Sequence, residues 1–113
     1  MKLLGKGMGA VPGTATGTVH TTSAAMVRAG GGILVRPSTD PNDIDGMEVA
    51  DGILTAEGGR MSHAAVVARG WGKPCVVGFG DRLQVKASGA FFDGKRVETL
   101  MIDGGSGEVW SGD

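Results

Sequence analysis

Short apolar runs alternate with helix-like segments along the first two-thirds of the chain. The runs in "GILVRP", "GILT" and "CVV", around residues 33–35, 53–55 and 75–77, are bounded by glycine or proline. Apolar runs of this length are typical of strands that are buried on both faces. The sequence therefore predicts three short buried strands with a helical segment between each pair.

Three segments carry helix signals. "SAAMVRAG" predicts a short helix ended by Gly30, and "SHAAVVARG" predicts another closed by Gly70. Between them, residues 38–40 ("STD") are candidate N-caps before a proline, which suits a first helical turn. We expect that helix to run over residues 41–50, with Gly46 as its weak point.

Strand patterns dominate both ends of the chain. Residues 8–22 are β-prone and punctuated by glycine, with a turn at Pro12-Gly13. After Asp81 the chain is a series of short β segments, with hairpin signals at Asp93-Gly94 and around Gly104-Gly105. This order predicts one mixed α/β domain over residues 1–113, compact and with a β-rich flank.

The composition indicates in which compartment the protein acts and which classes of partner it does not bind. Eleven basic and twelve acidic residues give a net charge of -1, so no basic surplus indicates nucleic acid. No stretch approaches the length of a membrane span, and the first residues do not form a signal peptide. Cys75 is the only cysteine, which excludes an internal disulfide and a cysteine-based zinc site. We expect a cytoplasmic protein that binds neither membrane nor nucleic acid.

His63 stands where a glycine-rich loop meets a helix. The first N–H groups of a helix lack intrahelical acceptors and carry partial positive charge, which favours a bound anion. Residues 64–68 have almost no polar face, so we expect the helix to be buried on most sides and to hold His63 rigidly. A largely neutral imidazole in this setting suits a nucleophile that becomes phosphorylated.

Chemistry alone leaves other roles open for His63. General base catalysis and metal binding need partner groups, and the only other histidine, His20, lies in a β-prone segment expected at the surface. A single histidine beside a glycine loop is more often a helix cap or a structural polar residue than a nucleophile.

The stretch "GGRMSHAAVVARGWGKPCVVG", Gly58 to Gly78, closely resembles the phosphohistidine signature of phosphoenolpyruvate-utilising enzymes. Together with the preceding "GILTAEGG", it looks most like pyruvate phosphate dikinase. The flanking segments "VPGTATGTV", "ILVRPSTDPNDIDGMEVADGILT" and "IDGGSGEVW" resemble the family in the same order. The resemblance therefore runs from Gly9 to Trp110, nearly the whole chain.

This resemblance implies a swivelling β/β/α phosphohistidine domain in which His63 is the phosphoryl-accepting nucleophile. It implies transfer between an ATP-grasp nucleotide-binding domain and a barrel that binds phosphoenolpyruvate or pyruvate, in the same chain or in trans. The whole enzyme would be a phosphotransferase with paired acceptors, and this domain alone would be inactive. Mg²⁺ and ATP are expected in the partner domains, and no metal or cofactor is expected in this one.

Five further residues of the signature are candidates for supporting the phosphoryl group: Gly58, Gly59, Arg60, Ser62 and Arg69. A side chain at either glycine would crowd that group, and the arginines offer charge-assisted donors. Arg69 is equally well explained as a cation at a helix C-terminus. Met61 stands where the family has threonine, which removes a hydroxyl and leaves Ser62 as a substitute donor.

Two alternatives remain at this stage. One is the mobile domain of phosphoenolpyruvate synthase, enzyme I or an antibiotic phosphotransferase, which the partner domains would distinguish. The other is a non-catalytic module of the same fold, against which the intact His63 argues.

Overall fold

The structure is a computed structural model that describes residues 1–113 throughout, with strands at both ends and the helices in the first two-thirds. The strands are β1 (Lys2–Lys6), β2 (Met8–Val11), β3 (Thr14–His20), β4 (Ile33–Arg36), β5 (Gly52–Thr55), β6 (Cys75–Val77), β7 (Leu83–Lys86), β8 (Gly89–Phe92), β9 (Lys95–Val97), β10 (Thr99–Asp103) and β11 (Glu108–Ser111). The helices are α1 (Ser23–Ala29), the 3-10 helix η1 (Pro41–Asp43), α2 (Ile44–Val49) and α3 (His63–Trp71).

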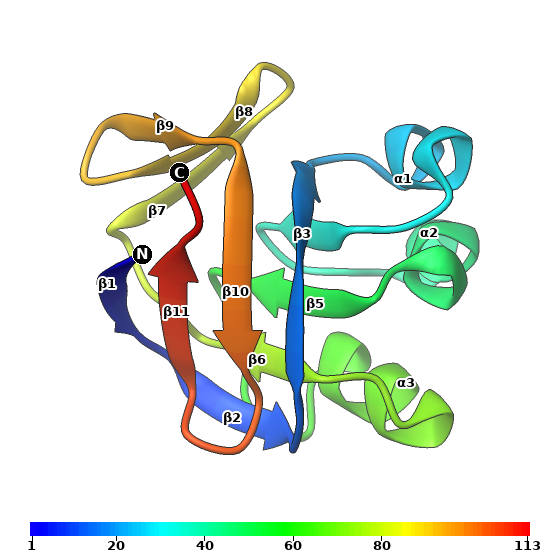
Figure 1. The fold of residues 1–113 in the computed structure, drawn as a ribbon. Helices are drawn as coiled ribbons and strands as arrows, with labels where there is room; N and C mark the ends of the chain where they lie inside the picture. Colours follow the sequence, from blue (N-terminus) through cyan, green and yellow to red (C-terminus); the bar gives the residue numbers. More distant parts are fainter.

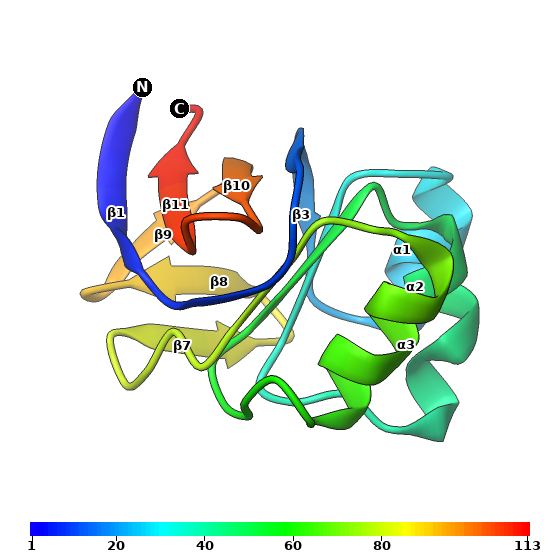
Figure 2. The same ribbon diagram turned by 90° about the horizontal axis from the view of Figure 1, so that it is seen from below.

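Eight strands form one mixed sheet in the order β1-β11-β10-β3-β4-β5-β6-β2. The neighbours β3, β4, β5 and β6 are parallel, and each connection between them passes through a helix. The α-helices lie together on one side of these parallel strands, and the antiparallel sheet β7-β8-β9 lies on the other (Figure 1, Figure 2). The mixed α/β class and the predicted alternation of strand and helix are confirmed.

Successive residues of the central strands face two separate cores. In β4, Ile33 and Val35 belong to the cluster that includes β7–β9, whereas Leu34 belongs to the cluster beneath the helices. All three side chains are fully buried, as the alternating directions of a strand between two layers require. The cluster beneath the helices also includes Met26 of α1 and Met47 of α2.

The end of α3 differs from the prediction. Gly70 does not close the helix, which continues to Trp71. Gly72 takes the left-handed conformation, with φ of 67°, and its N–H donates to the last carbonyls of the helix. The cap therefore falls two residues later than predicted, because Gly72 and not Gly70 has the backbone that glycine favours.

The burial of α3 also differs from the prediction. Ala64, Ala65 and Ala68 are buried against the sheet, but Val66 on the opposite face is 49% exposed. The expectation of a helix buried on most sides was wrong, because the alanine face packs against the core while Val66 on the opposite face remains exposed. The exposed face includes the turn that follows His63.

The helix predicted over residues 41–50 is divided into η1 and α2. Asp40 is the N-cap, and its carboxylate accepts the Asn42 N–H at 2.7 Å. Gly46 is not a weak point, since its N–H donates to Ser23 Oγ at 2.7 Å and any Cβ there would collide with Ser23. Glycine at this position lets α1 and α2 pack closely.

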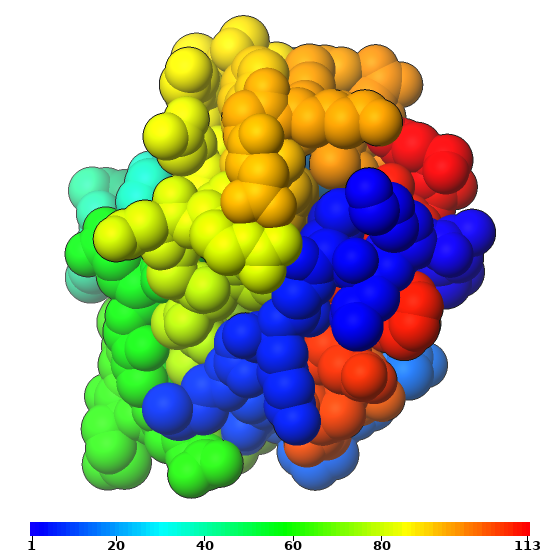
Figure 3. Space-filling model, turned by 90° about the vertical axis from the view of Figure 1, so that its left-hand side faces the viewer, coloured from blue at the N-terminus to red at the C-terminus, as the bar shows by residue number.

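The two predicted hairpins are present, joining β8 to β9 and β10 to β11. Asp93 and Gly94 both have positive φ, as a tight hairpin turn requires. The strand β1 was not predicted; it pairs with β11, so the blue N-terminal segment lies beside the red C-terminal residues in Figure 3. None of the helices is long and apolar enough to cross a membrane.

Candidate functional site

Two loops meet at the carboxyl ends of the parallel strands β4 and β5, the edge at which open α/β sheets usually place their sites. Hydrogen bonds extend the sheet into these loops. The Ala56 N–H donates to the Arg36 carbonyl at 3.2 Å, and the Glu57 N–H donates to the Pro37 carbonyl at 2.9 Å. The loop after β5 then leads into α3 and brings His63 beside the loop after β4.

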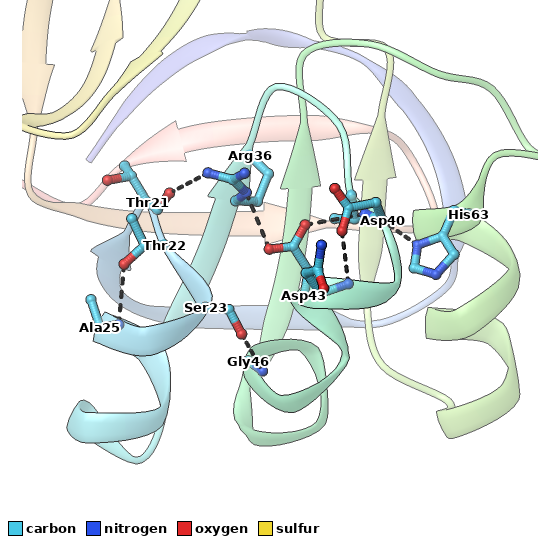
Figure 4. Close-up of polar contacts among 11 residues, drawn as sticks. Thr21, Thr22, Ser23, Ala25, Arg36, Asp40, Asp43, Gly46 and His63 are labelled. Atoms are coloured by element: carbon cyan, nitrogen blue, oxygen red, sulfur yellow. Dashed lines mark hydrogen bonds and ion pairs between the residues drawn. The ribbon is translucent and has the colours of Figure 1, made fainter.

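His63 is the first residue of α3, and a side chain from the loop after β4 contacts its ring (Figure 4). The Oγ1 atom of Thr39 lies 2.9 Å from Nδ1 of His63. This is the one hydrogen bond that the protein makes to the ring, so Nε2 has no partner within the chain. A hydrogen bond at one ring nitrogen restrains the orientation of the imidazole, and the Thr39 hydroxyl can accept from a protonated Nδ1 or donate to an unprotonated one.

The start of α3 offers free hydrogen-bond donors next to the ring. Ser62 is the N-cap, and its hydroxyl accepts the Ala65 N–H at 3.4 Å. The N–H groups of His63 and Ala64 have no acceptor within the chain. Together with the partial positive charge of the helix N-terminus, they favour an anion beside His63.

A small pocket of about 120 Å³ lies next to the histidine. Of the sequence-predicted site residues, His63, Ser62 and Gly58 line it, and Gly59, Arg60 and Arg69 do not. The complete lining consists of residues from the end of β5, the two loops and the start of α3: Ser38, Thr39, Thr55, Glu57, Gly58, Ser62, His63 and Ala64. Most of these side chains are polar, so the pocket suits a charged group better than an apolar ligand.

The two glycines of the signature differ in their surroundings. Gly58 has φ of 95°, and a Cβ there would lie 2.9 Å from Cβ of Ser62. The backbone of the loop therefore requires glycine at this position. Gly59 has ordinary backbone geometry, and a Cβ would point into open space.

Gly59 and Gly70 share a property found at no other glycine of the chain. Neither has a left-handed backbone, and neither has a protein atom within 4 Å of where a Cβ would lie. Gly70 follows His63 by seven residues, which places both on one face of α3. The fold of this chain does not explain glycine at either position.

The two arginines of the signature lie at the surface around the loop before α3. Arg69 donates to the Arg60 carbonyl at 3.1 Å and to the Ala10 carbonyl at 3.4 Å, and neither arginine forms an ion pair. Arg69 thus connects the loop before α3 to β2, and its positive charge is not paired with a carboxylate. Met61 is 86% exposed and does not line the pocket, so the missing threonine hydroxyl removes no donor from it.

Thr39 is the site residue that sequence reasoning missed. It was grouped with its neighbours as a candidate N-cap, but Asp40 takes that role and Thr39 is left free to contact His63. The sequence did contain a signal for Thr39. A helix has one N-cap and the "STD" segment offers three candidates, so two of these side chains were available for other contacts.

The chain has no group of three or more histidine, cysteine or acidic side chains placed to bind a metal ion. Cys75 is fully buried in the helix-side core, and burial raises the pKa of its thiol to about 12 against a smaller opposing effect of Arg69. A thiol of this kind is protonated and inert near neutral pH.

Comparisons with known proteins agree with the signature at Gly58–Gly78. The family described as PEP-utilising enzyme, mobile domain, matches residues 27–107. Pyruvate, phosphate dikinase of Rhizobium meliloti (strain 1021) is 44% identical over 122 residues, covering 98% of this chain and 13% of the relative. The chain therefore spans about an eighth of the length of that relative.

Two solved structures extend the comparison. The NMR solution structure of an Enzyme I protein (nEIt) is 29% identical with a TM-score of 0.50, over 71% of this chain and 30% of that one. The crystal structure of Thermococcus kodakaraensis aconitase X in its holo-form matches 100% of this chain and 99% of that one, with a TM-score of 0.59 and 23% identity. The second likeness concerns the fold alone. The family match over most of the chain and the identity to the dikinase show that the chain belongs to the mobile-domain family of PEP-utilising enzymes.

Proposed function

We propose that this chain is a phosphoryl carrier in which Nε2 of His63 accepts a phosphoryl group and later gives it up. The contact between Thr39 and Nδ1 carries the proposal, because it engages one ring nitrogen and leaves the other without a partner. With a proton on Nδ1 that is donated to Thr39, Nε2 keeps its lone pair for attack on phosphorus.

In the proposed step, the Nε2 lone pair forms a bond to phosphorus while the bond from phosphorus to the leaving oxygen breaks, in line. The proton stays on Nδ1, so the ring gains positive charge, and the Thr39 oxygen accepts its hydrogen bond. The phosphoryl oxygens lie toward the helix N-terminus, where the free N–H groups of His63 and Ala64 stabilise their negative charge. The reverse step restores the neutral ring.

The partners in this proposal are an ATP-grasp nucleotide-binding domain and a barrel that binds phosphoenolpyruvate or pyruvate. The 44% identity to a pyruvate, phosphate dikinase supports this assignment, and the much greater length of that relative leaves room for further domains. The domain swivels between the two, Mg²⁺ and ATP bind in the partners, and the whole is a phosphotransferase with paired acceptors. We expect it to act in the cytoplasm, where a lone cysteine such as Cys75 stays reduced.

A carrier of the enzyme I type is the second candidate. The solved Enzyme I protein favours it, but at a lower identity of 29% and over 71% of this chain. The two candidates differ in the partner that takes the phosphoryl group from His63, so each partner tests one of them.

Phosphoryl trapping tests the proposal. The chain is incubated with phosphoenolpyruvate and the barrel domain of a pyruvate phosphate dikinase, and its intact mass is measured. We expect the added mass of one phosphoryl group, labile in acid and stable in base, in the parent chain and in His20→Ala but not in His63→Ala. An unmodified chain, with the barrel shown to phosphorylate another carrier, would contradict the proposal.

A further inference from the structure

Asp43 is a carboxylate that the transfer step does not use, yet it is only 5% exposed. Its Oδ1 lies 3.4 Å from Nε of Arg36, the last residue of β4, and its Oδ2 accepts the Asp40 N–H at 3.1 Å. One side chain thus joins the end of β4 to the start of η1, across the loop of residues 37–39 (Figure 4).

Arg36 anchors this connection to the sheet. One of its terminal nitrogens donates to the Thr21 carbonyl at 2.9 Å, just beyond β3, and Asp43 is the only carboxylate it pairs with. The loop between β4 and η1 is therefore closed by contacts at both of its ends. Thr39 lies inside this closed loop, next to Asp40.

Capping alone does not account for Asp43. The capping box with Asp40 engages one of its carboxylate oxygens, and an exposed residue could do the same. The other oxygen faces Arg36 in a place with little access to water, where an unpaired charge would be costly. The cap therefore does not account for the pair with Arg36, and the loop that the pair spans carries the hydroxyl of Thr39.

We infer that Asp43 is a positioning residue for His63. By closing the loop with Arg36 and the Asp40 N–H, it holds Thr39 Oγ1 where that oxygen accepts the Nδ1 proton, and so selects the tautomer with a free Nε2. The catalytic consequence rests on the proposed function, but the tautomer is a property of this chain alone and is measured without any phosphoryl donor.

The substitution Asp43→Asn isolates this effect. The contact with Arg36 is an ion pair in which Nε makes no hydrogen bond, so it depends on the negative charge of Asp43, which an amide lacks. One contact must therefore break, and the loop loses a tie at one end. Asp45→Asn is the matched control, because Asp45 is an exposed acid two residues further on whose side chain forms no ion pair.

The readout is the tautomer of His63, obtained from ring ¹⁵N chemical shifts and their long-range couplings to ring protons. His20 is the only other histidine and serves as a control in the same spectrum. We expect the Nδ1–H form in the parent chain and in Asp45→Asn. In Asp43→Asn we expect His63 to shift toward the Nε2–H form while the His20 signals stay unchanged.

Thr39→Val and Thr39→Ser calibrate the result, since valine removes the hydroxyl and serine keeps it. A folded Asp43→Asn with the parent tautomer, when Thr39→Val has changed it, would overturn the inference. A Thr39→Val variant that keeps the parent tautomer would overturn it too. If Asp43→Asn does not fold, Arg36→Gln removes the ion pair from the other side and is expected to shift His63 in the same direction.

The rate of phosphorylation gives a second readout. If the tautomer is the cause, the rate for Asp43→Asn should fall by the same factor as the population of the Nδ1–H form. A changed tautomer with no phosphorylation of any variant, the parent included, would leave the positioning role standing and contradict the carrier function.

Discussion

The hydroxyl of Thr39 and the Nδ1 atom of His63 lie 2.9 Å apart, although 24 residues separate them in the sequence. The contact joins the loop after β4 to the first turn of α3. The hydrogen bond to the ring is therefore supplied by a neighbouring loop and not by the signature that contains the histidine. The signature and the loop after β4 together determine the surroundings of the His63 ring.

Replacing Thr39 with valine should slow the phosphorylation of His63. The hydrogen bond stabilises a ring that gains positive charge, and bonds to charged groups contribute about 1.5 to 3 kcal/mol. This corresponds to a loss of about tenfold to a hundredfold in rate. Single-turnover mass spectrometry with the barrel domain measures it. Thr39→Ser should keep most of the rate, and equal losses in both variants would show that the methyl group matters and the hydroxyl does not.

Gly70 and Gly72 should respond oppositely to alanine. Gly70 has ordinary helix geometry and open space, so Gly70→Ala should stabilise the chain by about 0.5 to 1 kcal/mol. Gly72 has φ of 67°, so Gly72→Ala should destabilise it by about 1 to 2 kcal/mol. Urea denaturation compares the two variants with the parent.

The variant Gly70→Ala also tests whether a partner surface approaches the exposed face of α3. We expect Gly70→Ala to lower the rate of phosphoryl transfer despite its greater stability, because the added methyl group stands on the His63 face of the helix. A stabilised variant with the parent transfer rate would show that nothing packs closely against Gly70.

Glu57 should limit the phosphorylated population of His63. Glu57 is one of the residues that line the pocket and is exposed to solvent, so a phosphoryl group there meets a like charge weakened by water. We expect Glu57→Gln to raise the equilibrium ratio of phosphorylated to free chain by about twofold to fivefold. Glu48→Gln changes an exposed acid outside the pocket, and an equal rise in that control would assign the effect to net charge.

The strands β4, β5 and β6 could be predicted because consecutive residues in each of them are apolar and buried. The prediction for Cys75–Val77 coincides with β6, since a strand between two layers has no polar position. β1 could not be predicted in this way. Its residues are exposed or half-buried, and its pairing depends on β11 at the other end of the chain.

In the candidate site, too, some residues could be predicted from the local sequence and others could not. His63 could be located because it stands between a glycine loop and a helix in the sequence. The roles of Thr39 and Asp43 could not, because each depends on a side-chain contact between segments that only the folded sheet brings together. The exposed face of α3 was missed for a related reason, since valine and alanine read alike until the position of the helix in its layer is known.

Cys75 should make the stability of the chain depend on pH in the alkaline range. Burial raises the pKa of its thiol to about 12, whereas a thiol in an unfolded chain titrates near pH 8.5. Between these values the folded chain keeps a proton that the unfolded chain releases. The stabilisation is therefore fully present below about pH 8.5 and is lost as the pH rises toward 12.

Comparison with Cys75→Val isolates this contribution, because valine keeps an apolar side chain in the same core position. We expect the free energy of unfolding of the parent chain to fall relative to that of the variant by about 2 kcal/mol between pH 7.5 and pH 10. Urea denaturation at the two pH values measures the difference, and the absence of tyrosine removes one other group that titrates in this range. A thiol that reacts rapidly with Ellman's reagent in the folded chain at pH 8, or a difference independent of pH, would contradict the burial that the structure assigns to Cys75.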